Sequence, residues 1–194
     1  ALRSIQQNDL AKIDPAKRVL GVIRPTAEII GQFTKTGNVG ILATKGTVIS
    51  NSYPIEIQKF YPEHNVFQEA CPMWVPLVEN NEYNNPGADY FIKKNISNLL
   101  EQSSDIDTIL LACTHYPLLM EKIKNVVPAE VTVLSQGEIV AESLKMYLEK
   151  HPEIEENCSK NGLISFFTTD SADDFDNHAA IFYGKPVKSK HLSL

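Results

Sequence analysis

Two short segments of the chain are apolar at every position, and they constrain the fold more than any other feature. Residues 39–43 read Val-Gly-Ile-Leu-Ala, and residues 109–112 read Ile-Leu-Leu-Ala. A strand with one solvated face alternates apolar and polar side chains, whereas a strand covered on both faces is apolar throughout. The two segments therefore predict strands that lie between two layers of helices, as in a mainly parallel sheet.

Further β-branched runs alternate with amphipathic segments along the chain. Pro25, Pro86 and Pro117 each precede an amphipathic segment, and proline suits the first position of a helix. This order predicts an α/β fold, a three-layer sandwich around a parallel sheet. We expect strands at 19–23, 38–44, 65–71, 108–114, 131–134 and 163–169, helices at 26–35, 87–102, 118–125 and 137–150, a helix start at Asp170 or Ser171, and loops at 80–86 and 151–161.

Charge and composition exclude several classes of protein. The chain carries 18 Lys and Arg against 24 Asp and Glu, a net charge of −6, which is the wrong sign for binding phosphate backbones. We therefore expect no nucleic-acid partner. No run approaches the about 20 apolar residues of a membrane helix, and no signal peptide is expected. Three widely spaced cysteines favour reduced thiols in a cytosol-like compartment. No metal site is expected, because four histidines lack a suitable spacing: His64, His151, His178 and His191.

The turn after the second apolar segment carries a cysteine and a histidine. Cys113 stands where a buried strand should end, and Pro117 where a helix should begin. Ligands of open parallel sheets bind beyond the carboxyl ends of the strands. Cys113 and His115 would point to the same side of an extended backbone, and a nearby helix N-terminus would lower the thiol pKa. The pair is either a proton-transfer pair, or a cysteine buried as a small apolar group beside an ordinary turn histidine.

Two other expected strand ends offer polar groups. Residues 43–50 read Ala-Thr-Lys-Gly-Thr-Val-Ile-Ser, which is not the order of a phosphate-binding loop. The hydroxyls and backbone N–H groups of this turn suit either a carboxylate ligand or ordinary turn chemistry. Residues 71–79 read Cys-Pro-Met-Trp-Val-Pro-Leu-Val-Glu. Glu79 is either a desolvated proton-transfer group or a solvated loop residue. Cys71 has no base partner in this pattern and is expected to be structural.

Together these three segments resemble the motifs of the glutamate racemases, within the aspartate/glutamate racemase superfamily. Residues 111–119 are similar to the family's second cysteine motif, and residues 43–50 with Tyr53 to its Ala-Thr-x-Gly-Thr turn. Residues 71–79 are similar to its Cys-Pro loop that ends in Val-Pro-Leu-Val-Glu. Residues 21–25 also fit, with Arg24 where the family usually has Glu. The likeness is strong from about residue 19 to 138 and weaker to about 184.

The resemblance implies a cofactor-independent inversion of glutamate at Cα, which supplies D-glutamate for peptidoglycan. Two bases on opposite faces of the substrate take and return the proton. Glutamate is the implied partner, no cofactor or metal ion is implied, the cytoplasm is the expected compartment, and a homodimer stays open. The resemblance implies that Cys113 is the base on the L-glutamate face, that His115 and Glu79 assist proton movement, and that Thr114, His115, Thr47 and Thr44 bind the substrate.

The sequence departs from the family pattern in its first part. An Asp-Ser-Gly loop, a Pro-Tyr-Gly turn and the first catalytic cysteine in Cys-Asn-Thr do not occur in these 194 residues. Residues 1–10 resemble the helix that follows that cysteine. We expect residues 25–129 to form a complete second α/β domain, and residues 1–24 and 130–194 a remnant of an incomplete first domain.

A polypeptide of these residues alone is expected to be inactive as a racemase, because efficient inversion needs a second positioned group. Two alternatives remain open. One alternative to a glutamate racemase is an aspartate racemase or related superfamily member. The other is a non-catalytic amino-acid-binding fragment.

Overall fold

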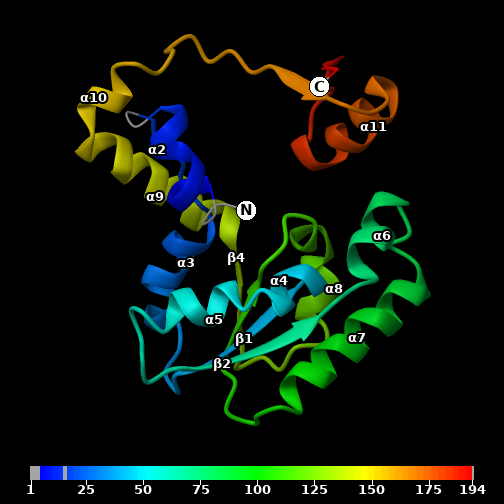
Figure 1. Cartoon of the computed structure of the whole chain (residues 1–194). Coiled ribbons are helices and arrows are strands. Elements are labelled where there is room, and N and C mark those ends of the chain that lie inside the picture. The colour runs from blue at the N-terminus through cyan, green and yellow to red at the C-terminus, as the bar shows by residue number, and fades with distance from the viewer. Residues whose placement is uncertain (1–4, 15–16, 194) are drawn as a thin grey trace.

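A four-stranded parallel sheet forms around the two segments that are apolar throughout (Figure 1). The structure is a computed structural model and describes residues 5–14 and 17–193. The strand order is β2-β1-β3-β4, all parallel, so β1 and β3 form the central pair. The α/β prediction with a parallel sheet is therefore confirmed. The strands are β1 (Asn38–Ala43), β2 (Asn65–Ala70), β3 (Thr108–Leu111) and β4 (Thr132–Ser135).

Helices connect and cover these strands, and a second, two-stranded parallel sheet, β5-β6, lies near the carboxyl end of the chain. From the end of β4, α9 leads away from the main sheet, and α11 lies above α6 (Figure 1). In chain order these elements are η1 (Ile5–Asp9), α2 (Leu10–Ile13), α3 (Ile23–Ile29), η2 (Ile30–Gln32), α4 (Lys45–Ile49), α5 (Ser52–Ile57), α6 (Trp74–Glu79), α7 (Pro86–Leu100), η3 (Tyr116–Leu119), α8 (Met120–Lys124), α9 (Gln136–Lys150), α10 (Pro152–Glu155), β5 (Phe166–Thr168), α11 (Ala172–Tyr183) and β6 (Ser189–His191).

Successive residues of the central strands face opposite layers of helices, which is why both segments are apolar throughout. Ile109 and Leu111 pack in a cluster with buried side chains of α6, α7 and α8. Leu110 and Ala112 pack in a second cluster, with buried side chains of α3 and α5. Burial of this apolar surface on both faces is the main favourable term in folding.

The helices predicted at 87–102 and 137–150 are confirmed as α7 and α9, and Ser171 caps α11 by accepting from the backbone N–H of Asp174. The strand predicted at 19–23 is wrong. Residues 17–22 have no regular structure, and α3 begins at Ile23. The β-branched side chains favour a strand, but a strand needs a neighbour to pair with, and the described residues provide none at this place.

Three further boundaries differ from the predictions. The loop predicted at 151–161 contains α10, which begins at Pro152. β3 ends at Leu111 rather than at residue 114, because the chain turns after Ala112. The helix expected at 118–125 begins at Tyr116, as the 3-10 turn η3.

The predicted division into two domains stays a prediction. Residues 1–4 and 15–16 of the expected first domain lie outside the described residues, and residues 1–4 are part of the helix expected at 1–10. β4 follows residue 129 and pairs with β3, so the main sheet continues to Ser135. In the ranges that the structure describes, no helix is long and apolar enough to cross a membrane.

The Asp107 carboxylate joins the start of β3 to the turn that precedes β1. It accepts hydrogen bonds from Thr34 Oγ1 at 2.5 Å, from the backbone N–H of Lys35 at 2.7 Å and from that of Thr36 at 3.0 Å. Thr108 Oγ1 donates at 3.2 Å. Burial raises the pKa of Asp107, but these hydrogen bonds together outweigh burial and hold the pKa below its ordinary value of 3.8.

Replacing Asp107 with asparagine should lower the free energy of unfolding at pH 7 by about 1–2 kcal/mol, because a charged acceptor of several hydrogen bonds is lost. A carboxyl group with a lowered folded pKa stabilises the fold above its unfolded pKa, and this stability is lost as the pH falls through the folded pKa. The parent should therefore lose stability more steeply than Asp107→Asn below about pH 4. Urea unfolding between pH 7 and pH 3 measures both effects. Asp105→Asn, an exposed carboxylate nearby, is the control, and equal slopes for parent and Asp107→Asn would contradict this role.

Candidate functional site

The site lies at the carboxyl edge of the sheet, between β1 and β3. From β1 the chain goes to β2 on one side, and from β3 it goes to β4 on the other. Open parallel sheets bind ligands at such a reversal of strand order. The turns that follow the two strands lie next to each other, because the backbone N–H of Ala112 donates to Leu42 O at 2.9 Å. Thr44 and Cys113 begin these turns.

Cys113, His115 and Glu79 form a continuous chain of contacts at this edge. Cys113 Sγ lies 3.8 Å from His115 Nδ1, and His115 Nε2 lies 3.2 Å from Glu79 Oε1. Cys113 is half-buried, and the side chains of His115 and Glu79 are 23% and 54% exposed. The predicted proximity of Cys113 and His115 is therefore found, although a turn rather than extended backbone produces it.

Two buried aromatic side chains hold the elements that carry these residues. Trp74 begins α6, the helix that ends at Glu79, and Tyr116 follows His115 directly. Both rings are fully buried and meet edge to face with centroids 4.8 Å apart. Tyr116 also donates its hydroxyl to Cys71 O at 3.2 Å. The aromatic pair therefore fixes the position of α6 relative to the turn after β3.

Burial raises the pKa of the Cys113 thiol above its ordinary value. The backbone N–H groups of His115 and Tyr116 oppose this shift, while the negative charge of Glu79 adds to it. The expectation of a lowered pKa is therefore wrong, because burial exceeds the effect of the N–H groups in the short turn. A thiol with a raised pKa is mostly protonated at neutral pH, so it needs a nearby base to become a thiolate.

Two of the candidate threonines, Thr44 and Thr114, lie on the two neighbouring turns, and Thr47 lies in α4, which begins directly after Thr44. Thr44 caps α4 by accepting from the backbone N–H of Thr47 at 3.4 Å, and the two hydroxyls lie 3.0 Å apart. Thr114 is exposed, with its hydroxyl 3.4 Å from His115 Nδ1. Their roles in binding stay predictions. The arrangement offers hydroxyl and N–H donors beside the thiol, which suits an acidic ligand.

The other two cysteines lie outside this chain of contacts. Cys71 is buried, which raises its pKa, and its thiol donates to Glu69 O at 3.8 Å. This agrees with the structural role expected for it. Cys158 is exposed. Within residues 5–14 and 17–193, no group of three His, Cys, Asp or Glu side chains could hold a metal ion.

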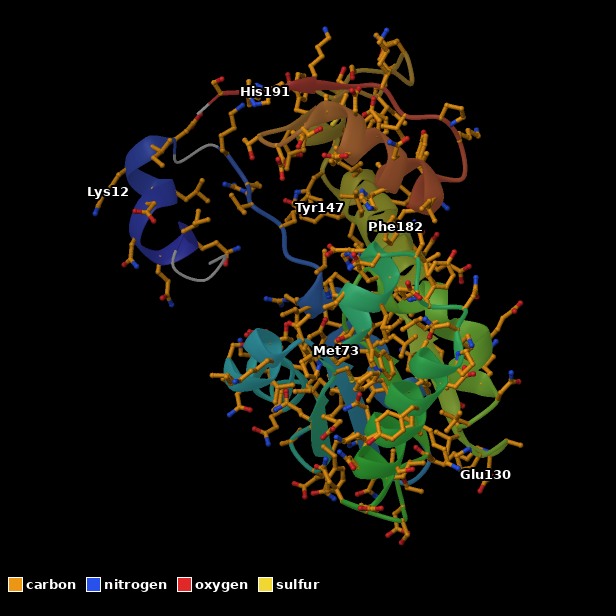
Figure 2. The ribbon with its side chains drawn as sticks, turned by 90° about the vertical axis from the view of Figure 1, so that its right-hand side faces the viewer. Lys12, Met73, Glu130, Tyr147, Phe182 and His191 are labelled. Atoms are coloured by element: carbon orange, nitrogen blue, oxygen red, sulfur yellow. The ribbon has the colours of Figure 1, made fainter. Side chains whose placement is uncertain are left out.

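Sequence reasoning missed two residues near the site. Phe182, at the end of α11, places its ring 5.2 Å from the His115 ring at an interplanar angle of 76°. Figure 2 shows the labelled Phe182 above the main sheet and above the labelled Met73. Gln136, the first residue of α9, accepts a hydrogen bond from the Tyr53 hydroxyl at 2.8 Å. Its position two residues after the strand predicted at 131–134 could have pointed to this edge, whereas the pattern around Phe182 gives no such signal.

Comparison with known proteins gives related sequences and structures. No family model matches the chain. The chain is 33% identical over 177 residues to a glutamate racemase of Lactiplantibacillus plantarum, a match that covers 91% of this chain and 64% of the relative. It is 36% identical over 182 residues to glutamate racemase 2 of Caldanaerobacter subterraneus subsp. tengcongensis, covering 91% of this chain and 67% of the relative.

A solved glutamate racemase structure is also similar to this chain. Glutamate racemase isoform RacE1 from Bacillus anthracis matches with a TM-score of 0.81 and 30% sequence identity, over 96% of this chain and 69% of that chain. The chain spans slightly less than two thirds of the Lactiplantibacillus relative and slightly more than two thirds of the Caldanaerobacter relative.

Proposed function

Because this chain belongs to the glutamate racemase family, we propose that its Cys113 edge binds glutamate and exchanges a proton with Cα without a cofactor. One observation carries the proposal. The Cys113 thiol lies at the β1–β3 reversal, within 3.8 Å of an imidazole whose other nitrogen contacts a carboxylate. This arrangement supplies the base that a protonated thiol needs.

The contacts of His115 support a specific division of labour. A neutral imidazole with its proton on Nε2 donates to Glu79 and leaves Nδ1 able to accept the thiol proton, a tautomer assigned from its partners. The resulting imidazolium lies beside the Glu79 carboxylate, which stabilises it. The Cys113 thiolate then takes the Cα proton of glutamate, giving a thiol and a carbanion, and returns a proton in the reverse step.

The hydroxyls of Thr44, Thr47 and Thr114 would bind the substrate. Each can donate a hydrogen bond to a carboxylate, and the backbone N–H groups of the same turns add donors. Thr44 and Thr47 already orient each other through their hydroxyls. Glutamate carries two carboxylates, which fits a site with hydroxyls on both sides of the reversal.

We assign inversion, the second half of racemisation, to a longer assembly than these 194 residues. The family pattern places the other catalytic cysteine, the first in chain order, in Cys-Asn-Thr, a string that this sequence does not contain. The proposal therefore includes a two-domain racemase that supplies D-glutamate for peptidoglycan in the cytoplasm, in which this chain provides the base on the L-glutamate face.

Exchange without inversion is the expected behaviour of the 194-residue polypeptide. In D₂O, proton NMR should show loss of the Cα–H signal of L-glutamate, since Cys113 can return a deuteron to the same face. The Cα–H signal of D-glutamate should persist, and chiral chromatography should detect no D-glutamate formed from L-glutamate. L- and D-aspartate are the control ligands.

Each outcome of this assay separates the candidate functions. Exchange of L-aspartate in preference to L-glutamate would favour the aspartate racemase alternative. Binding of L-glutamate without any exchange, measured by calorimetry, would favour the non-catalytic binding fragment and contradict the proposal.

A further inference from the structure

The side chain of Gln136, at the start of α9, bonds to two other parts of the chain, α5 and residues 22–26. Its Oε1 accepts from the Tyr53 hydroxyl at 2.8 Å. Its Nε2 donates to Val22 O at 3.3 Å and to Thr26 Oγ1 at 3.2 Å. The three partners come from α5, from the segment before α3 and from α3 itself.

Two of these partners are buried hydroxyls. Tyr53 is 2% exposed and Thr26 is 0% exposed. A buried polar group that loses its hydrogen-bond partner carries a desolvation cost. The Gln136 carboxamide therefore satisfies two groups that cannot turn to bulk water without movement of α3 or α5.

Tyr53 connects Gln136 to the proposed site. Its ring packs in the same buried cluster as Ala43 and Ala112, the residues directly before Thr44 and Cys113. Burial raises the pKa of Tyr53 to about 12, and the nearby Cys113 sulfur adds to this shift when it is charged. Tyr53 thus belongs to the buried cluster from which the two turns of the site begin.

Gln136 also lies at the point where the chain leaves the main sheet for the elements that follow β4. Val22 is the last residue before α3, and Gln136 is the first residue after β4. Figure 1 shows α3 and α9 side by side at this place. From α9 the chain leads through α10 and β5 to α11, which brings Phe182 against His115.

We propose that Gln136 is a positioning residue for the Cys113 site. Its carboxamide bonds the start of α9 to Tyr53 and to the segment that leads into α3. These bonds hold the turn that carries Cys113 in place and set the direction in which α9 leaves the sheet. The inference rests on the proposed function of that site, but it concerns the packing around the thiol and can be tested without substrate.

The test measures the alkylation of Cys113 by iodoacetamide between pH 6 and pH 10 in the 194-residue protein, with each thiol quantified by peptide mass spectrometry. Exposed Cys158 is the internal reference. Gln136→Leu removes the polar atoms of the side chain and shortens it by one atom. We expect it to raise the ratio of Cys113 to Cys158 alkylation about tenfold at pH 7.5, and to move the pH midpoint for Cys113 downward, because loosening hydrates the thiol.

Two milder variants keep the test informative if Gln136→Leu folds poorly. Tyr53→Phe removes only the hydroxyl that donates to Gln136, and should raise the same ratio about threefold. Gln136→Glu can still accept from the Tyr53 and Thr26 hydroxyls but cannot donate to Val22 O. It should therefore raise the ratio, but by less than Gln136→Leu does.

Gln102→Leu is the matched control. Like Gln136 Nε2, Gln102 Nε2 donates to two oxygen atoms; these are Gln68 O at 3.1 Å and Asn98 O at 3.4 Å, away from the Cys113 turn. It should leave the alkylation ratio unchanged. An equal rise in Gln102→Leu would show general loosening and overturn the inference, as would an unchanged ratio in both Gln136→Leu and Tyr53→Phe.

Failure of the proposed function gives a different pattern. If the alkylation ratio rises in Gln136→Leu while the parent exchanges no Cα hydrogen of L-glutamate, the positioning role stands and the proposed function falls. If the parent exchanges the Cα hydrogen of L-glutamate but the alkylation ratio does not rise in Gln136→Leu, the proposed function stands and the positioning role falls.

Discussion

Cys113→Ala should abolish the exchange of the Cα hydrogen of L-glutamate, with a fall of at least about 100-fold in rate. The substitution removes the group that the proposal assigns as the base, while His115 and Glu79 keep their own contact at 3.2 Å. The measurement is the loss of the Cα–H signal in D₂O. Because Cys113 is half-buried, the smaller alanine should change the free energy of unfolding by only about 1 kcal/mol.

Cys158→Ala is the matched control, since it removes an exposed thiol and should leave the exchange rate unchanged. The parent rate should also rise with pH as the thiol with its raised pKa ionises. Exchange that continues in Cys113→Ala at the parent rate would end the assignment of Cys113 as the base.

Trp74→Ala should lower the free energy of unfolding by about 3–5 kcal/mol, the range for a buried aromatic side chain cut to alanine. Trp74 is fully buried, packs edge to face on Tyr116, and donates its ring N–H to Phe91 O at 3.4 Å. The substitution leaves a cavity beneath α6. Because α6 carries Glu79, the exchange of L-glutamate should also slow at temperatures where the variant is folded.

Urea unfolding followed by circular dichroism measures the stability change. Tyr90→Ala is the control, because Tyr90 is 61% exposed on the neighbouring helix α7 and should change the free energy of unfolding by less than about 1 kcal/mol. A loss of less than about 1.5 kcal/mol in Trp74→Ala would contradict the role of the aromatic pair as the support of the site.

The central part of the fold could be predicted because its signals are local and strong. β1 and β3 are apolar on both faces, and α7 begins with Pro86 behind a capping Asn85 and carries one apolar stripe. The segments 45–49, 52–57 and 74–79 were not predicted as helices. These helices are short, and Pro54 and Pro76 lie inside two of them. Their local helix propensity is therefore low, and packing against the rest of the fold stabilises them instead.

The candidate site could be predicted only in part for a related reason. The closeness of Cys113 and His115 follows from a separation of two residues, whereas the contact of His115 with Glu79 spans 36 residues. The motif resemblance indicated Glu79 as a candidate residue. Only the packing of Trp74 on Tyr116 explains why Glu79 lies close to His115. Gln136 and Phe182 reach the site through the fold alone.

The raised pKa of Cys113 has a consequence for the resistance of the protein to oxidants. Peroxides attack the thiolate, and a sulfur kept mostly neutral by its surroundings reacts slowly with them. In the proposed mechanism the thiol ionises when the neighbouring imidazole takes its proton, so the sulfur would be protected from peroxides between proton transfers. The half-buried position that raises the pKa of Cys113 would thus also slow its oxidation.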